Sequence, residues 1–262
     1  KGLLTMGKRS RKNTNYKPEQ APQEDVLKEE DPYRRQKKLL NHNFKLEAIK
    51  PLTENQRKAF YAFGSDKHLL LYGVAGTGKT FLGLYFGLSE LFSGNVRQII
   101  IVRSAVASRD LGFMPGTLSE KMAVYEAPYK DICAELSGGR RDVYDTLKKK
   151  GNLDFMSTSF IRGLTFDDAI LIVDEVQNLT DHELNSVLTR VGKNCKVILC
   201  GDFRQDDLKM NGKKSQETGI HNMIKIARAM PSFDLIEFQI GDIVRSGFVK
   251  EYIITRHNLK LD

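Results

Sequence analysis

Short apolar runs alternate with longer amphipathic stretches along most of this chain. The apolar runs predict β-strands at residues 68–72, 98–102, 153–157, 169–174, 196–201 and 233–237. The amphipathic stretches predict helices at residues 55–63, 79–92, 118–136, 181–191, 220–230 and 247–257. Short strands that are apolar at nearly every position and are separated by helices are typical of a parallel sheet covered on both faces. We therefore expect an α/β fold with a mostly parallel sheet covered by helices.

The same pattern divides the chain into two parts. Residues 1–44 are rich in Lys, Arg, Asn, Gln, Glu and Pro, and this composition predicts a basic, disordered N-terminal arm. Residues 45–262 carry the apolar runs and are expected to form one domain. Within that domain, residues 104–165 make a connection longer than one helix needs, so we expect an inserted segment with its own helices.

The overall composition is that of a globular protein. Hydrophobic residues make up 40% and charged residues 28% of the 262 residues, which excludes a collagen-like, wholly disordered or disulfide-scaffold protein. No apolar run approaches the roughly 20 residues of a membrane span, so we expect a soluble protein with no membrane partner. The three cysteines form no disulfide or metal-binding pattern, which favours a cytoplasmic location.

The net charge of +8 is concentrated in the predicted arm. Residues 1–50 hold 13 Lys and Arg against 7 Asp and Glu, a balance of +6, which leaves +2 for the rest of the chain. A basic arm can bind the phosphates of a nucleic acid in a salt-dependent way. A solvated terminus that aids solubility is an equally good interpretation.

The strongest local signal is a G-x-x-x-x-G-K-T motif at residues 73–80. It follows a predicted strand and precedes a predicted helix, which is the context of a phosphate-binding loop. The glycines let backbone N–H groups surround phosphate oxygens, the lysine reaches the β- and γ-phosphates, and the threonine hydroxyl binds Mg²⁺. The predicted nucleotide-binding residues are Gly73, Val74, Ala75, Gly76, Thr77, Gly78, Lys79 and Thr80.

Two polar clusters follow other predicted strands. Asp174 and Glu175 end the run 169–174, at the edge of the sheet where open α/β folds bind ligands. Asp174 suits a Mg²⁺ ligand, and Glu175 suits the general base that aligns an attacking water. Two adjacent acids there favour hydrolysis over transfer to a second substrate. Gln205 lies just after the strand 196–201 and is a candidate contact to the γ-phosphate.

With these landmarks in this order, the chain resembles the PhoH-like family, a group of P-loop ATPases related to superfamily 1 helicases. The resemblance covers roughly residues 50–257, and its motifs lie at residues 52–56, 73–80, 102–106, 111–116, 161–166, 173–178, 201–205 and 242–246. It implies a RecA-like P-loop NTPase fold and Mg²⁺-dependent ATP hydrolysis. No PIN nuclease or KH-type domain is recognisable within the chain, as in short phage-type members.

The resemblance also implies roles for single residues. Gln56 matches a glutamine that reads the adenine edge, which implies ATP as the nucleotide. Gln205 matches a γ-phosphate sensor, and Arg245 matches an arginine that stabilises transition-state charge; with Lys79 and Glu175 they make the expected catalytic set. A ring of identical subunits, expected to be a hexamer, is implied as well, with Arg245 acting across the subunit interface.

Two further arginines and two departures from the family pattern complete the comparison. Arg103 and Arg162 fall within family motifs and are candidates to contact nucleic acid or a neighbouring subunit. Ser104 stands where the family usually has proline, and Ser246 stands where it usually has histidine.

Three functions remain open on the sequence. The first is an ATPase coupled to binding of, or movement along, RNA or single-stranded DNA. The second is an ATP-driven switch or assembly factor acting on a protein, which the nearly neutral core favours. The third is a nucleotide-binding module without turnover, against which Glu175 argues.

Overall fold

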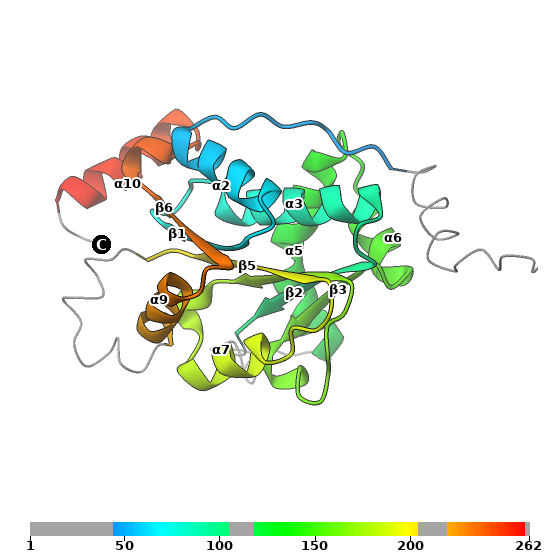
Figure 1. Cartoon of the computed structure of the whole chain (residues 1–262). Helices are drawn as coiled ribbons and strands as arrows, with labels where there is room; N and C mark the ends of the chain where they lie inside the picture. Colours follow the sequence, from blue (N-terminus) through cyan, green and yellow to red (C-terminus); the bar gives the residue numbers. More distant parts are fainter. Residues whose placement is uncertain (1–43, 105–117, 204–218, 260–262) are drawn as a thin grey trace, which may run out of the picture. The chain divides into compact units, whose positions relative to one another are not determined.

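The computed structural model describes residues 44–104, 118–203 and 219–259 (Figure 1). Three earlier predictions lie wholly or partly outside these ranges: Gln205, the arm apart from Phe44, and residues 105–117 of the expected inserted segment, with the motif at 111–116.

Among the described residues, six strands form one sheet in which every neighbouring pair runs parallel. The strands are β1 (His68–Gly73), β2 (Gln98–Arg103), β3 (Leu153–Ser157), β4 (Ala169–Asp174), β5 (Cys195–Gly201) and β6 (Phe233–Phe238). Their order across the sheet is β3-β2-β4-β5-β1-β6. This arrangement confirms the expected RecA-like α/β fold, and it brings the carboxyl ends of all six strands to one edge.

The main helices lie where the sequence predicts them. They are α2 (Glu54–Gly64), α3 (Lys79–Ser93), α5 (Leu118–Leu136), α7 (Asp181–Leu188), α9 (Ile220–Ala229) and α10 (Gly247–Asn258). A shorter helix α6 (Val143–Lys149) and the 3₁₀ turns η1 (Thr158–Phe160), η2 (Val176–Asn178) and η3 (Ile240–Asp242) join them. None of the helices that the structure describes is long and apolar enough to cross a membrane.

Local hydrogen bonds explain where two of these helices begin or end. Helix α7 starts at a capping box, in which Thr180 and Glu183 satisfy each other's backbone N–H groups. The helix ends before residue 191, the predicted end, because Val191 forms a parallel bridge with Phe166. The N–H of Phe166 donates to the carbonyl of Arg190 (2.8 Å). Thr189 and Arg190 therefore form a turn after Leu188, and the pairing of Val191 prevents the helix from continuing to that residue.

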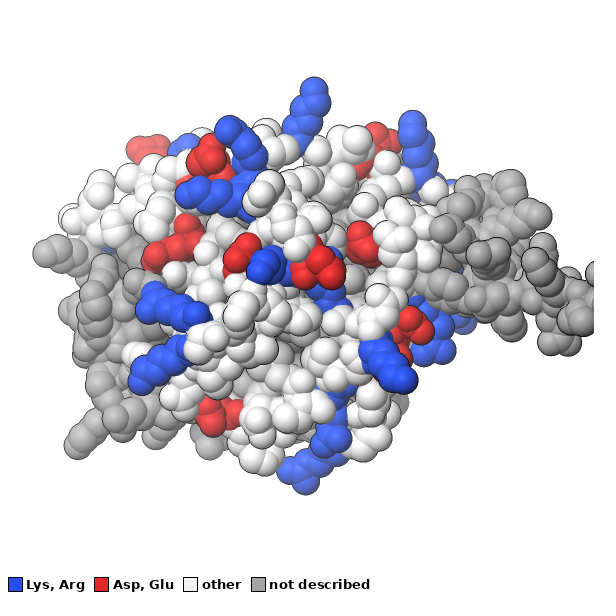
Figure 2. All heavy atoms as spheres, in the orientation of Figure 1, with Lys and Arg blue, Asp and Glu red and all other residues white. Residues whose placement is uncertain are grey.

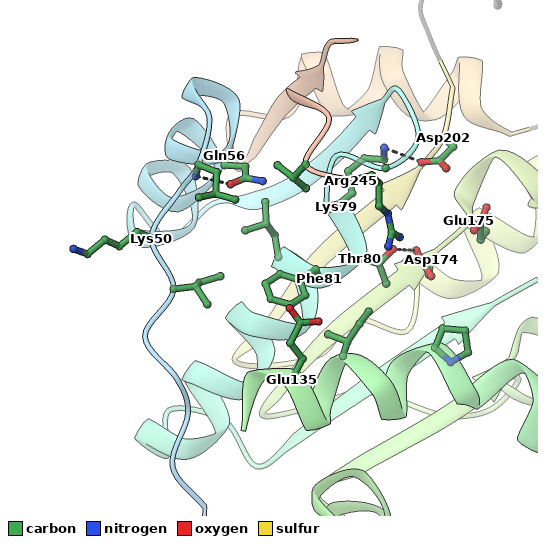
Figure 3. Close-up of a pocket in the computed structure, with 18 of the residues that line it drawn as sticks. Lys50, Gln56, Lys79, Thr80, Phe81, Glu135, Asp174, Glu175, Asp202 and Arg245 are labelled. Carbon is green, nitrogen blue, oxygen red and sulfur yellow. Dashed lines mark hydrogen bonds and ion pairs between the residues drawn. The ribbon is translucent and has the colours of Figure 1, made fainter. Parts of the chain in front are cut away.

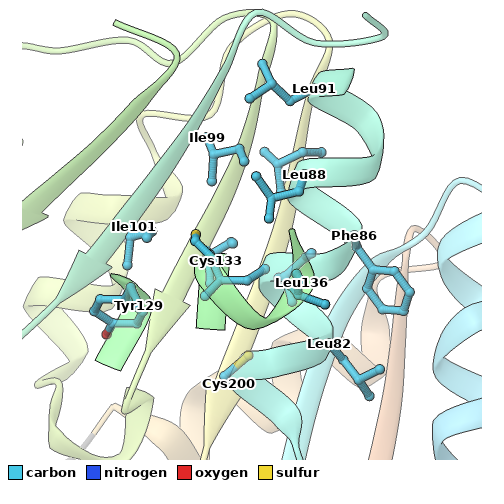
Figure 4. Packing of buried hydrophobic residues seen from close by; sticks show 14 of the residues in the cluster. Leu82, Phe86, Leu88, Leu91, Ile99, Ile101, Tyr129, Cys133, Leu136 and Cys200 are labelled. Carbon is cyan, nitrogen blue, oxygen red and sulfur yellow. The ribbon is translucent and has the colours of Figure 1, made fainter. Parts of the chain in front are cut away.

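The two faces of the sheet carry separate hydrophobic clusters. Alternate residues of each strand point to opposite faces, so Leu69 and Leu71 of β1 belong to one cluster and Leu70 and Tyr72 to the other. Helices α2, α3, α5 and α6 cover the first face, and α7 and α9 cover the second (Figure 1). Figure 4 shows α3 and α5 packed against β2, β4 and β5 on the first face.

The described part of the segment 104–165 is built into this core. It contains α5, α6 and the edge strand β3, which pairs with β2. Tyr129 and Cys133 of α5 and Tyr144 of α6 are fully buried in the first cluster. The segment is thus the crossover connection between β2 and β3, because a parallel pair needs such a connection. The sequence suggested an insertion because two helices, rather than one, make this crossover.

Candidate functional site

The loop between β1 and α3 has the backbone shape that its glycines allow. Gly73, Gly76 and Gly78 have φ angles of 124°, 77° and 86°, values that other residues rarely adopt. A Cβ on Gly73 would overlap the carbonyl of Phe238 in the neighbouring strand. Gly78 precedes α3 without any side-chain cap, so the first N–H groups of that helix remain available for an anion.

Lys79 lies inside this loop. Its ammonium donates to the carbonyl of Val74 (2.7 Å) and to the hydroxyl of Thr77 (3.2 Å), and the residue is 5% exposed. It also forms an ion pair with Asp202 at the end of β5, with 2.7 Å between Nζ and Oδ1. The loop therefore presents a buried positive charge whose counter-ion comes from another strand.

Thr80 and Asp174 are joined by a side-chain hydrogen bond in the site. The Thr80 hydroxyl donates to Asp174 Oδ1 (2.9 Å), and the phenol of Tyr129 donates to Asp174 Oδ2 (2.9 Å). Burial raises the pKa of Asp174, and the hydrogen bonds from Tyr129 and Thr80 oppose that rise. A buried carboxylate beside a hydroxyl is a donor set of hard oxygens, which suits Mg²⁺ shared with phosphate oxygens.

Glu175 is held in an unusual backbone conformation. Its φ of 54° and ψ of 44° are left-handed, a conformation that costs free energy for a residue with a Cβ. Gln177 Nε2 donates to Glu175 Oε2 (2.6 Å), and Arg103 Nη2 lies 3.7 Å from Oε1. Burial and the adjacent Asp174 raise the pKa of Glu175, and Arg103 opposes them. A carboxylate in this setting is suited to accept a proton from water.

These groups line one cavity of about 730 Å³ at the carboxyl edge of the sheet (Figure 3). Of the predicted site residues, it brings together Gln56, Gly76, Gly78, Lys79, Thr80, Asp174, Glu175 and Arg245. Figure 3 shows Phe81, Lys50 and Glu135 on the side of the cavity away from Lys79 and Asp202, and the lining also includes the apolar Ile49, Leu52 and Ile132. The cavity thus combines the polar groups at the loop with apolar side chains, as a nucleotide requires.

Gln56 and Arg245 both contact the loop in their own chain. The Gln56 amide donates to the carbonyl of Thr77 (3.2 Å) and accepts from the N–H of Leu52 (2.8 Å). Gln56 therefore braces the loop in addition to facing the cavity. The Arg245 side chain points into the cavity beside Gly76 (Figure 3). Arg245 therefore lies at the loop of its own chain, and its expected action across a subunit interface stays a prediction.

Other residues divide between the site and the surface. Arg103 pairs with Glu175, and its Cα is in register with that of Asp174, but Arg162 is exposed and outside the cavity. Tyr129, Asp202 and Gln177 contribute contacts that the sequence did not assign to them. Asp202 and Gln177 lie within the family motifs at residues 201–205 and 173–178, and these motifs were the sequence signal that could have identified them. The hydrogen bond between Tyr129 and Asp174 depends on how α5 packs on the sheet, so no local sequence pattern predicts it.

Removing the Tyr129 hydroxyl tests whether it positions Asp174. Tyr129→Phe leaves a buried carboxylate oxygen without its donor, and we expect a loss of about 1–3 kcal/mol in the free energy of unfolding. We also expect weaker binding of Mg²⁺ with nucleotide. Urea unfolding and a Mg²⁺ titration with nucleotide present measure the two effects. Tyr125→Phe on the same helix is the control, and an equal effect of both variants would contradict this role.

Comparisons with known proteins identify the family of this chain. Residues 48–256 match the family model described as PhoH-like protein. A PhoH-like protein of Bacillus subtilis (strain 168) is 33% identical over 217 residues, which are 82% of this chain and 66% of that protein. Protein PhoH of Escherichia coli (strain K12) is 34% identical over 199 residues, 75% of this chain and 55% of that protein. The chain therefore spans between about half and two thirds of these relatives.

Solved structures show more distant likenesses. The SWI2/SNF2 ATPase core of Sulfolobus solfataricus, in complex with dsDNA, has a TM-score of 0.43 at 8% identity and covers 74% of this chain and 46% of that chain. The Pif1 helicase of Candida albicans has a TM-score of 0.36 at 18% identity and covers 80% of this chain and 44% of that chain. The match over residues 48–256, with relatives identical at a third of aligned positions, shows that this chain belongs to the PhoH-like family.

Proposed function

We propose that this protein is a Mg²⁺-dependent ATP hydrolase coupled to the binding of RNA or single-stranded DNA. The observation that carries the ATPase part is the meeting of Lys79, Thr80, Asp174 and Glu175 at one cavity. The chemistry of phosphoryl transfer needs little beyond positioning and the gathering of charge, and these four residues supply both.

The proposed reaction is an attack of water on the γ-phosphorus. The oxygen of water bonds to that phosphorus while the bond to the β,γ-bridging oxygen breaks, which releases ADP and inorganic phosphate. Glu175 accepts the proton of the attacking water. Lys79 and Arg245 offset the charge of the phosphate oxygens. Thr80 and Asp174, together with the phosphates, would hold Mg²⁺, which would neutralise further phosphate charge when bound.

The nucleotide is proposed to be ATP because Gln56 lines the cavity, as the resemblance implies. Its amide already has partners at Leu52 and Thr77, but each end of an amide can make one more hydrogen bond. A base placed against Leu52 and Phe81 would lie within the same cavity as Gln56. This supports a base-contacting role that does not disturb the brace on the loop.

The nucleic-acid part rests on the charge of the arm and on the helicase-like glutamine. Outside residues 1–50 the balance of charge is only +2. Figure 2 shows basic and acidic side chains interspersed on the face drawn. A nearly neutral core favours the second candidate, an ATP-driven switch or assembly factor that acts on a protein partner. A hexameric ring stays part of the proposal, although Arg245 reaches the cavity without a neighbour.

The two candidates differ in their response to nucleic acid. We expect single-stranded RNA or DNA to stimulate the ATPase rate of the full chain several-fold. If four arm cations bind phosphates, raising salt from about 50 to about 200 mM weakens this binding on the order of 50-fold. Steady hydrolysis that does not respond to either strand would contradict the nucleic-acid part and favour a protein partner.

A matched pair of charge variants assigns the binding to the arm. In the full chain, four arm cations are changed to Gln: Lys8, Arg9, Arg11 and Lys12. The control changes four exposed core cations to Gln: Lys149, Lys150, Lys193 and Lys225. Stimulation is expected to be lost in the first variant and kept in the second. Equal loss in both would mean that net charge, rather than the arm, sets the affinity.

A further inference from the structure

Asp202 supplies the counter-ion of Lys79 from the middle of the sheet. Strand β5 lies between β1 and β4, so the residue after it lies between the phosphate-binding loop and the Asp174–Glu175 pair. Asp202 Oδ1 is 2.7 Å from Lys79 Nζ, and the Lys79 side chain is 4% exposed against 42% for Asp202 (Figure 3). The loop lysine is therefore neutralised by an acid of its own chain that faces the cavity.

A short chain of hydrogen bonds links this ion pair to Glu175. The backbone N–H of Asp202 donates to Gln177 Oε1 (3.1 Å), and Gln177 Nε2 donates to Glu175 Oε2 (2.6 Å). The packing around Gln177 is tight, because a Cβ on Gly201 would come within 3.0 Å of its Oε1. A shift of the backbone at Asp202 would alter its hydrogen bond to Gln177, which also holds the carboxylate of Glu175.

We propose that Asp202 occupies the place of the γ-phosphate on Lys79, and that Gln177 conveys its displacement to Glu175. This inference rests on the proposed function and names what the site distinguishes, a nucleoside triphosphate from a diphosphate. A γ-phosphate brings negative charge to the face of Lys79 that Asp202 occupies, so the like-charged carboxylate must leave. A diphosphate leaves that face free. Of the three donors of the ammonium, those on Asp202 and Val74 can stay in place, while the third turns from the Thr77 hydroxyl to the β-phosphate.

The first test compares the affinities for ATP and ADP in Asp202→Asn. This variant keeps the shape of the side chain but removes the charge that the γ-phosphate must displace. We expect ATP to bind more tightly on the order of fivefold, the scale of a partly exposed ion pair, and ADP to change less than about twofold. Calorimetry with Mg²⁺ present measures both dissociation constants.

Glu135→Gln is the matched control, because Glu135 is another acid of the same cavity that forms no ion pair with Lys79. It reports the general effect of removing one negative charge, and we expect it to change both affinities by the same factor. An equal factor for ATP and ADP in Asp202→Asn, with wild type binding and hydrolysing ATP, would overturn this inference alone. Wild-type protein that binds neither nucleotide would overturn the proposed function as well.

The second test concerns Gln177 as a positioning residue. Gln177→Ala removes the link between Asp202 and Glu175 without touching Lys79, so kcat is expected to fall on the order of tenfold while the dissociation constant of ATP stays the same. The tighter binding of ATP relative to ADP that we expect for Asp202→Asn should persist when Asp202→Asn is combined with Gln177→Ala. A parallel loss of ATP affinity in Gln177→Ala would show a general disturbance of the site and would overturn the proposed link.

Discussion

Replacing Glu175 with glutamine is expected to lower the rate of ATP hydrolysis by a factor on the order of 10²–10⁴. The amide has nearly the same shape as the carboxylate but cannot accept the proton of the attacking water. In the wild-type protein, burial and the adjacent Asp174 raise the pKa of Glu175 toward neutrality, which favours proton transfer from water. Binding of ATP should persist, because Lys79 and the loop amides are unchanged. Single-turnover hydrolysis and ATP binding measure the two properties.

Glu251→Gln on the exposed surface of α10 makes the same chemical change away from the cavity and serves as the control. A residual rate in Glu175→Gln within a few-fold of wild type would assign the base to another group. Loss of both binding and turnover would instead mean that Glu175 holds the site together. The contact with Arg103 at 3.7 Å is the interaction to examine in that case.

Gly73→Ala is expected to lower the free energy of unfolding by about 3 kcal/mol or more and to abolish nucleotide binding. The φ of 124° disfavours any residue with a Cβ, and that Cβ would overlap the backbone carbonyl of Phe238. The same carbonyl accepts a hydrogen bond from the N–H of Val74 (3.0 Å), so β6 cannot retreat without losing that bond. The start of the loop and the edge of the sheet must therefore separate.

The control is Gly64→Ala at the last residue of α2. A Cβ there meets no atom within 4 Å and its φ is not left-handed, so the change should stay within about 0.5 kcal/mol or stabilise slightly. Urea unfolding without nucleotide measures both variants, and calorimetry measures ATP binding. Similar unfolding midpoints for Gly73→Ala and wild type would contradict the close packing of β1 on β6.

Much of this protein could be predicted from local patterns. The apolar runs placed the strands because a buried parallel strand is apolar at nearly every position, and the helices followed from the periodicity of the amphipathic stretches. The phosphate-binding loop was recognisable because its glycines adopt positive φ angles that other residues rarely adopt, and because its whole motif lies within eight consecutive residues. Asp174 and Glu175 were predictable for a similar reason, since polar residues that end a buried strand face the ligand edge.

The tertiary structure decided what lies next to what. The order β3-β2-β4-β5-β1-β6 puts β5 between the loop and Asp174, which sets Asp202 against Lys79. The packing of α5 on the sheet brings Tyr129 to Asp174 across 45 residues of sequence. The turn after β6 carries Arg245 to the loop of its own chain. These contacts depend on strand order and helix packing, which are set by the burial of whole faces rather than by any local run of residues. The sequence by itself thus determined the helices, the strands and the residue types that carry the chemistry. The tertiary structure determined which side chains contact each other.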